Sequence, residues 1–98
     1  MTEMDHAYDV ERLVVRDDRR VVPDGTVVTC LEYEEALNVA RELYDEYCVA
    51  GCVIWRVPYD RTLHLHLKGE VDRLAFVGRK DVFWSPYHKA LVVETIEL

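Results

Sequence analysis

Two histidines with strand spacing are the sharpest chemical feature of the sequence. His64 and His66 alternate with leucines in the run Leu63-His64-Leu65-His66-Leu67. On a β-strand, residues two apart project from the same face, with Cβ atoms roughly 7 Å apart. Two imidazoles so placed can bind zinc or another divalent metal once a further ligand joins them. The candidates for that ligand are His88, Asp60, Asp72 or a cysteine. No second motif identifies which of them it would be.

The same alternation has a purely structural interpretation. His64 and His66 can form the solvent face of a strand whose leucine face is buried. An isolated H-x-H pair lacks the surrounding context that defines metalloenzyme motifs. We therefore expect no metal or cofactor, and keep a metal-binding protein or metalloenzyme built on the histidine pair as the alternative function.

No motif in the sequence supports catalysis by a nucleophile or a nucleotide. Ser85 and His88 lie close in sequence, but no G-x-S-x-G elbow surrounds the serine and no acid is placed to orient the histidine. Ser85-Pro86 is more typical of the start of a short helical turn. Phosphate-binding glycine motifs and H-E-x-x-H are also missing from the sequence. We expect a non-enzymatic protein.

An aromatic cluster near the C-terminal end provides a candidate interaction site. The cluster comprises Phe83, Trp84 and Tyr87. Two basic residues, Arg79 and Lys80, precede it, and Lys89 follows it. Trp, Tyr and Arg are enriched at the energetic centres of protein interfaces, and aromatic and basic residues together can stack single-stranded bases. Alternatively, Phe83 and Trp84 complete a small core. Trp84 and Tyr87 are our candidates for an interaction.

The second candidate surface is acidic. The net charge is −7, with 13 acidic and five basic residues in positions 1–50 against six and seven in positions 51–98. This balance gives no basic footprint for direct nucleic-acid binding. A negative surface speeds association with a basic partner, and its candidates are Glu35, Glu42, Asp45 and Glu46 on the predicted helix, with Asp9, Asp17 and Asp18. The alternative is an ordinary solvated helix face.

These features together predict a small acidic binding or regulatory protein that acts through a protein–protein surface. Its concrete form is an inhibitor or adaptor of a basic, nucleic-acid-binding partner, of phage or mobile-element type. A homodimer is a further option, because a terminal strand leaves an edge for pairing.

The cytoplasm is the expected compartment, without membrane attachment. The longest apolar runs are four or five residues, against about 20 for a membrane span. Residues 1–12 have no basic start and no apolar stretch, so we expect no secretory signal. The sequence has only three cysteines, Cys30, Cys48 and Cys52, and none of them is in C-x-x-C spacing. This small, odd number predicts buried reduced thiols.

One amphipathic helix is predicted at about residues 33–49. Its apolar stripe comprises Ala36, Leu37, Ala40, Leu43, Tyr44, Tyr47 and Cys48. We expect it to start near Tyr33 and to stop at Gly51. A capping box at Thr29-x-x-Glu32 would begin it earlier.

Strand patterns occupy the rest of the chain. Residues 1–7 are expected to fray, and Pro23-Asp24-Gly25 to form a turn between two strands. The predicted strands are 8–15, 21–22, 26–31, 52–57, 63–67, 71–77 (or a short helical turn) and 90–98. The expected order is three strands, the helix, two strands, an optional strand and a last strand. This predicts an α+β fold in a single domain, residues 1–98, with a mostly antiparallel sheet packed against one main helix.

Overall fold

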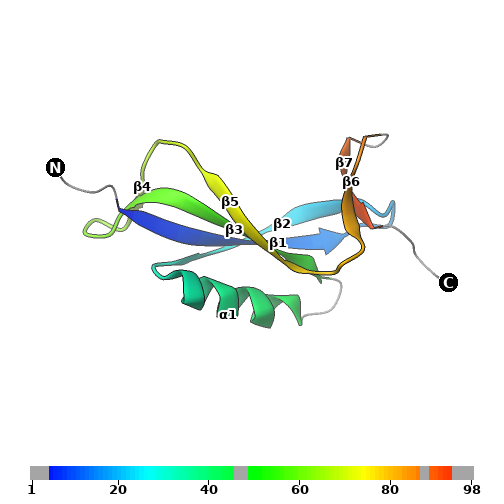
Figure 1. Cartoon of the computed structure of the whole chain (residues 1–98), viewed down its shortest axis with the longest axis horizontal. Helices are drawn as coiled ribbons and strands as arrows, with labels where there is room; N and C mark the ends of the chain where they lie inside the picture. The colour runs from blue at the N-terminus through cyan, green and yellow to red at the C-terminus, as the bar shows by residue number, and fades with distance from the viewer. Residues whose placement is uncertain (1–4, 46–48, 87–88, 94–98) are drawn as a thin grey trace.

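The computed structural model describes residues 5–45, 49–86 and 89–93, and it has the predicted α+β architecture. Its elements, shown in Figure 1, are β1 (His6–Val15), β2 (Val21–Cys30), α1 (Tyr33–Tyr44), β3 (Val49–Asp60), β4 (Leu65–His66), β5 (Asp72–Gly78), β6 (Val82–Ser85) and β7 (Ala90–Val93).

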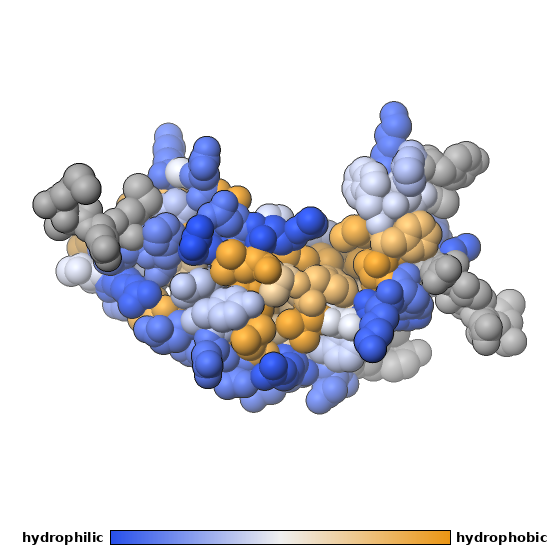
Figure 2. All heavy atoms as spheres, in the orientation of Figure 1, coloured by the Kyte–Doolittle hydropathy of each residue, from blue (hydrophilic) through white to orange (hydrophobic). Residues whose placement is uncertain are grey.

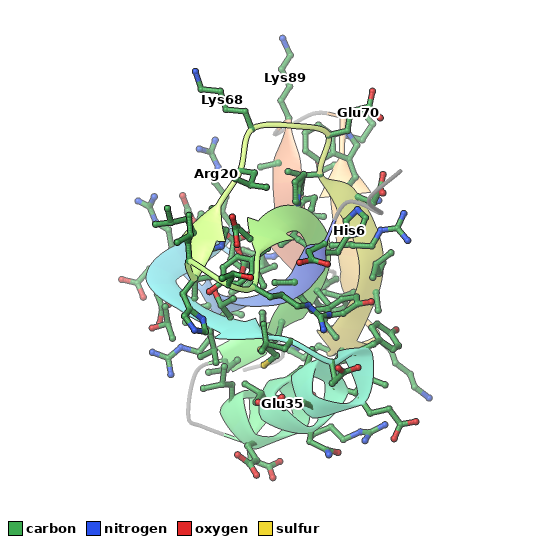
Figure 3. All side chains as sticks on the ribbon, turned by 90° about the vertical axis from the view of Figure 1, so that its left-hand side faces the viewer. His6, Arg20, Glu35, Lys68, Glu70 and Lys89 are labelled. Atoms are coloured by element: carbon green, nitrogen blue, oxygen red, sulfur yellow. The ribbon has the colours of Figure 1, made fainter. Side chains whose placement is uncertain are left out.

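The main sheet has the order β2-β1-β3-β4, and β5 pairs with β3 beside β4. All strand pairings among the described residues are antiparallel. The short β6–β7 hairpin forms a second sheet, joined to β2 by a bridge between Arg20 and Val92. Figures 1 and 3 show α1 against one face of the main sheet and the β6–β7 hairpin on the opposite side. Within the described part of the chain, the second face of the main sheet therefore has no covering helix.

The core lies between α1 and the main sheet. Strand alternation sends every second side chain toward the helix, and the fully buried members of this layer include Val10, Cys52 and Ile54. Ala36 and Ala40, one turn apart, are also fully buried. Their small side chains allow α1 to lie close to the sheet.

The helix begins where predicted but ends earlier. Glu32 is the N-cap residue and makes no side-chain capping bond, while the Thr29 hydroxyl donates to Asp9 Oδ1 at 2.7 Å. The start near Tyr33 is confirmed and the capping box is wrong. α1 ends at Tyr44, and Val49 already belongs to β3. The predicted stripe residues 47–48 lie outside the described residues.

Gly51 is not the stop signal of the helix. It lies inside β3 opposite Gly78 of β5. A Cβ atom at Gly51 would lie 2.6 Å from Phe76 Cζ and 2.7 Å from the Val77 carbonyl oxygen. The glycine therefore permits a close approach of two strands, a long-range requirement that its sequence neighbours do not reveal.

Two strands, not three, precede the helix. The expected hairpin of residues 8–15 with 21–22 is confirmed, but β2 runs through Pro23-Asp24-Gly25 without a chain reversal. The register shifts between Glu11 and Leu13, so the segment around Gly25 forms a β-bulge. The prediction that residues 1–7 fray is also wrong for His6 and Ala7, which belong to β1, with Ala7 fully buried.

Arg12 fixes this bulge. Its guanidinium donates to Asp24 Oδ2 at 2.7 Å and to Thr26 Oγ1 at 3.0 Å. The hydrogen bond from Arg12, supported by the Thr26 backbone N–H, holds the pKa of the Asp24 carboxyl below its ordinary value. A carboxyl whose pKa falls on folding stabilises the protein above its unfolded pKa. That contribution disappears as the pH falls through the folded pKa.

Replacing Arg12 by methionine is expected to lower the free energy of unfolding by about 1 kcal/mol at neutral pH. At an acidic pH below the folded pKa of Asp24 the loss should shrink, because Asp24 is then protonated in both proteins. Urea unfolding at the two pH values measures the difference. Arg20→Met is the control, since the Arg20 side chain lies 3.7 Å from Asp18 and is half-exposed. An Arg12→Met loss independent of pH would contradict the ion pair.

Candidate functional site

The uncovered face of the main sheet and the β6–β7 hairpin enclose an apolar groove. Two adjoining hollows of about 420 and 560 Å³ make it up, and both are lined by Val53, Arg73, Trp84 and Leu91. The first continues onto Glu11, Leu13, Val21, Pro23 and Trp55, and the second onto Leu74, Ala75, Phe76, Val82 and Phe83. We call this combined feature the hairpin groove.

Packing at its base holds the hairpin in place. Val82 and Leu91 pack against a buried cluster of Leu13, Val21, Ala50 and Val53. In the connection from β5, the Arg79 backbone N–H donates to the Ala50 carbonyl at 2.9 Å. Arg79 also forms an ion pair with Asp81, which lowers the pKa of the Asp81 carboxyl. Trp84 is the register partner of Leu91, so this packing also positions Trp84.

Large apolar side chains around the groove are exposed. Phe83 is 44% and Trp84 59% exposed, and Leu74 and Phe76 on β5 are also exposed. Figure 2 shows hydrophobic atoms gathered over the middle of the sheet and continuing onto the hairpin at the right. Trp84 is therefore a surface residue, and the alternative that Phe83 and Trp84 complete a core is wrong. Tyr87, the other aromatic candidate, lies outside the described residues.

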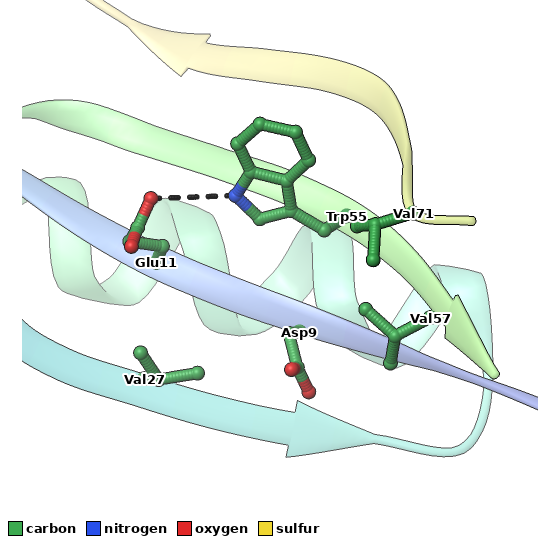
Figure 4. Close-up of a pocket in the computed structure, with 6 residues that line it drawn as sticks. All are labelled: Asp9, Glu11, Val27, Trp55, Val57 and Val71. Atoms are coloured by element: carbon green, nitrogen blue, oxygen red, sulfur yellow. Dashed lines mark hydrogen bonds between the residues drawn. The ribbon is translucent and has the colours of Figure 1, made fainter. Parts of the chain in front are cut away.

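A smaller pocket adjoins the groove on the same face of the sheet. It has a volume of about 300 Å³ and is lined by Asp9, Glu11, Val27, Trp55, Val57 and Val71 (Figure 4). The Trp55 indole N–H donates to Glu11 Oε1 at 3.3 Å. Asp9 accepts the Thr29 hydroxyl and has His66 Nε2 at 3.0 Å from its Oδ2. We call this smaller pocket the Trp55 pocket.

The strand expected at residues 63–67 is largely absent. β4 comprises only Leu65 and His66, and His64 lies in the preceding turn with φ of 55°. Asp60 Oδ1 accepts the backbone N–H groups of Thr62 and Leu63, both at 2.9 Å, and so turns the chain at the end of β3. The leucines of this run are all exposed, so the expectation of a buried leucine face is wrong.

The histidines consequently do not share a strand face. His66 contacts the ring of Tyr59, with ring centroids 5.2 Å apart, and the carboxylate of Asp9. Among residues 5–45, 49–86 and 89–93, no group of three or more His, Cys, Asp or Glu side chains is arranged to hold a metal ion. His88, one of the ligands considered, lies outside these residues. No geometry in those ranges favours zinc binding.

The acidic candidates lie away from the groove. Glu35 and Glu42 on α1 and Asp45 at its C-cap are exposed. Figure 3 shows Glu35 at the opposite extreme of the molecule from Lys89, which directly precedes β7. Glu46 lies outside the described residues. Asp9 shares their charge, but it lines the Trp55 pocket on the other face of the sheet.

The sequence interpretation missed the floor of the groove. The apolar run around Trp55 predicts a central strand, but it does not say which face of the sheet the Trp55 side chain occupies. In the structure the neighbouring Ile54 is fully buried against the helix layer. Strand alternation from Ile54 would have placed Trp55 on the opposite face with Val53 and Val57. Glu11 lacked any such signal, because it meets Trp55 across 44 residues of sequence.

Two of the three thiols belong to the core. Cys30 and Cys52 are buried, as expected of small apolar residues. Burial raises the pKa of the Cys30 thiol, and the nearby charges of Glu35 and Asp9 add to the increase. Cys48 lies outside the described residues.

Comparison of the chain with family models, curated proteins and solved structures found no match. Within the part of the chain that the structure describes, no helix has the length and apolar character needed to cross a bilayer.

Proposed function

We propose that the protein is a small non-enzymatic binding protein and that the hairpin groove is its protein–protein surface. The observation that carries the proposal is the exposure of Phe83 and Trp84 directly beside Leu74 and Phe76. Leaving apolar area in water costs about 25 cal/mol per Å². Contiguous exposed apolar surface of this kind is typical of an interaction site.

A polypeptide partner fits this surface better than a compact small molecule. Among the described residues β5 pairs only with β3, so its outer edge is open beside the groove. An extended partner segment can pair with such an edge while its side chains enter the adjacent hollow. Trp84 has the residue type and exposure of an interface anchor.

The net charge of −7 favours a basic partner, such as a nucleic-acid-binding protein that this chain inhibits or recruits. The acidic side chains of α1 lie on the other side of the sheet, so their contribution is to the long-range field that steers association. The low cysteine count, with Cys30 and Cys52 buried in the core, supports a reducing compartment such as the cytoplasm.

The test compares Trp84→Ser with a matched control, Leu63→Ser, whose exposed leucine lies in the turn before β4. The partner recovered with the wild-type protein should be retained by Leu63→Ser and lost by Trp84→Ser, while Trp84→Ser changes the free energy of unfolding by less than about 1 kcal/mol. Retention of the partner by Trp84→Ser would contradict the proposal.

Sedimentation of the same proteins tests a second copy as the occupant. A wild-type dimer that dissociates in Trp84→Ser would make the groove a homodimer interface. A monomeric wild-type protein that recovers no partner at low or high salt would remove the proposed function.

A further inference from the structure

We propose that the Trp55 pocket binds one basic side chain, a lysine or an arginine, of the polypeptide that occupies the hairpin groove. This inference rests on the proposed function, because it assigns a chemical identity to part of the same partner. Its support comes from the lining of the pocket, its size and its continuity with the groove.

The lining combines the two features that a basic side chain requires. Lys and Arg carry an aliphatic stem and a charged head. Val27, Val57 and Val71 supply apolar contacts for a stem. Trp55, together with the carboxylates of Asp9 and Glu11, surrounds the position of a head. A cation over an indole ring is further stabilised by the ring quadrupole.

Both carboxylates are held in position by bonds that leave acceptor capacity. Glu11 accepts from Trp55, and Asp9 accepts from Thr29 and contacts His66. A carboxylate offers about four lone-pair sites, so each can still accept from an incoming ammonium or guanidinium group. The Asp9 side chain is only 16% exposed, which strengthens its interaction with a cation relative to one in bulk water.

The charges around the pocket favour a cation over an anion. The His66 ring contacts the Asp9 carboxylate, and the His66 side chain is 53% exposed to solvent. Arg73 is the register partner of Trp55 on β5, and it lines the groove and not the pocket. A carboxylate entering the pocket would meet both Asp9 and Glu11, whereas a neutral aliphatic side chain would cover these carboxylates without donating a hydrogen bond to either.

Size and continuity point to a side chain of the groove's own partner. A volume of about 300 Å³ lies at the lower limit for ligand sites, which suits one side chain. Glu11 and Trp55 line both the pocket and the groove. One extended segment can therefore place apolar side chains beside Trp84 and a basic side chain beside Trp55.

The experiment uses a display library of random peptides selected on the wild-type protein. Selected peptides should carry a lysine or arginine next to apolar residues. Fluorescence polarisation should show about tenfold weaker binding to Glu11→Gln, and a similar loss when the peptide lysine is replaced by norleucine. Combining Glu11→Gln in the protein with norleucine in the peptide should weaken binding little more than either change alone. Glu34→Gln, an equal charge change at an exposed helix position, should leave binding unaltered.

The outcomes separate this inference from the proposed function. Peptides that lose binding to Trp84→Ser but not to Glu11→Gln or Asp9→Asn would overturn the pocket and leave the groove. Loss with Glu11→Gln but not with Trp84→Ser would support the pocket and contradict the groove. Tight binding of free n-butylammonium would overturn a polypeptide occupant in favour of a small amine. Near-UV circular dichroism of each variant establishes that the fold is retained.

Discussion

Replacing Gly78 by alanine is expected to lower the free energy of unfolding by about 3 kcal/mol. A Cβ atom at this position would lie 2.5 Å from both the Ala50 carbonyl oxygen and Gly51 Cα. These are backbone atoms, so a rotamer change cannot relieve the clash. β5 and β3 would have to separate at the point where Gly78 and Gly51 are register partners.

Gly25→Ala is the control for this prediction. Gly25 has φ of +92°, and a Cβ atom added there would have no neighbouring atom within 4 Å. Alanine at this position therefore meets conformational strain without a clash, and we expect a loss of about 1 kcal/mol. Urea unfolding of both variants separates the two effects. Equal losses would show that β3 and β5 do not depend on the close approach at Gly78.

The Gly78 variant also bears on the binding surface. β5 carries Leu74 and Phe76, which line the groove, so displacement of β5 should weaken partner binding as well as stability. Gly25 lies in the bulge of β2, outside the groove lining. Its replacement should therefore leave partner binding unchanged wherever the protein is folded.

Elements defined by local periodicity were predicted well from the sequence. The i, i+4 spacing of Ala36 and Ala40 identified the helix and its buried side, and both residues are fully buried. The β-branched segments before the helix gave a correct hairpin, and the apolar run around Ile54 gave the central strand. In these segments the local pattern and the long-range packing agree.

Elements whose conformation depends on distant residues were not predictable in the same way. Gly51 has the position of a helix stop, but its role is set by Gly78 across the sheet. Pro23 and Gly25 have the pattern of a chain reversal, but Arg12 on β1 binds Asp24 and Thr26 and keeps the segment in β2. Each correction arises from a contact between segments far apart in the chain.

The candidate site was predicted only in part for the same reason. Trp84 was selected by residue type, and its exposure beside the groove fits that selection. The leucines around His64 satisfy a strand pattern, but they remain exposed. Residue type can select Trp84 as a candidate, but it cannot assemble the groove from β1, β2, β3, β5 and the hairpin.

Truncating Ile54 to alanine is expected to have the largest effect on stability, a loss of about 4 kcal/mol. Ile54 is among the largest fully buried side chains and packs in the cluster that joins β3 to α1. The fully buried helix residues of that cluster, Ala36 and Ala40, are too short to fill the space, and the larger helix side chains that pack against it, such as Leu37, are only partly buried. The cavity therefore collapses little, which places the cost toward the upper end of the range for such changes. Ile54→Val should lose only about 1 kcal/mol.

Comparison of Ile54→Ala with Trp84→Ser tests whether the two faces of the sheet act independently. Ile54 belongs to the helix layer, whereas its neighbours Val53 and Trp55 line the groove on the other face. Ile54→Ala, studied where it remains folded, should bind the partner as the wild type does despite its lower urea midpoint. Trp84→Ser should lose partner binding while its urea midpoint stays close to that of the wild type. Weakened binding by folded Ile54→Ala would mean that helix packing also shapes the groove, because displacement of β3 would then move Val53 and Trp55 with it.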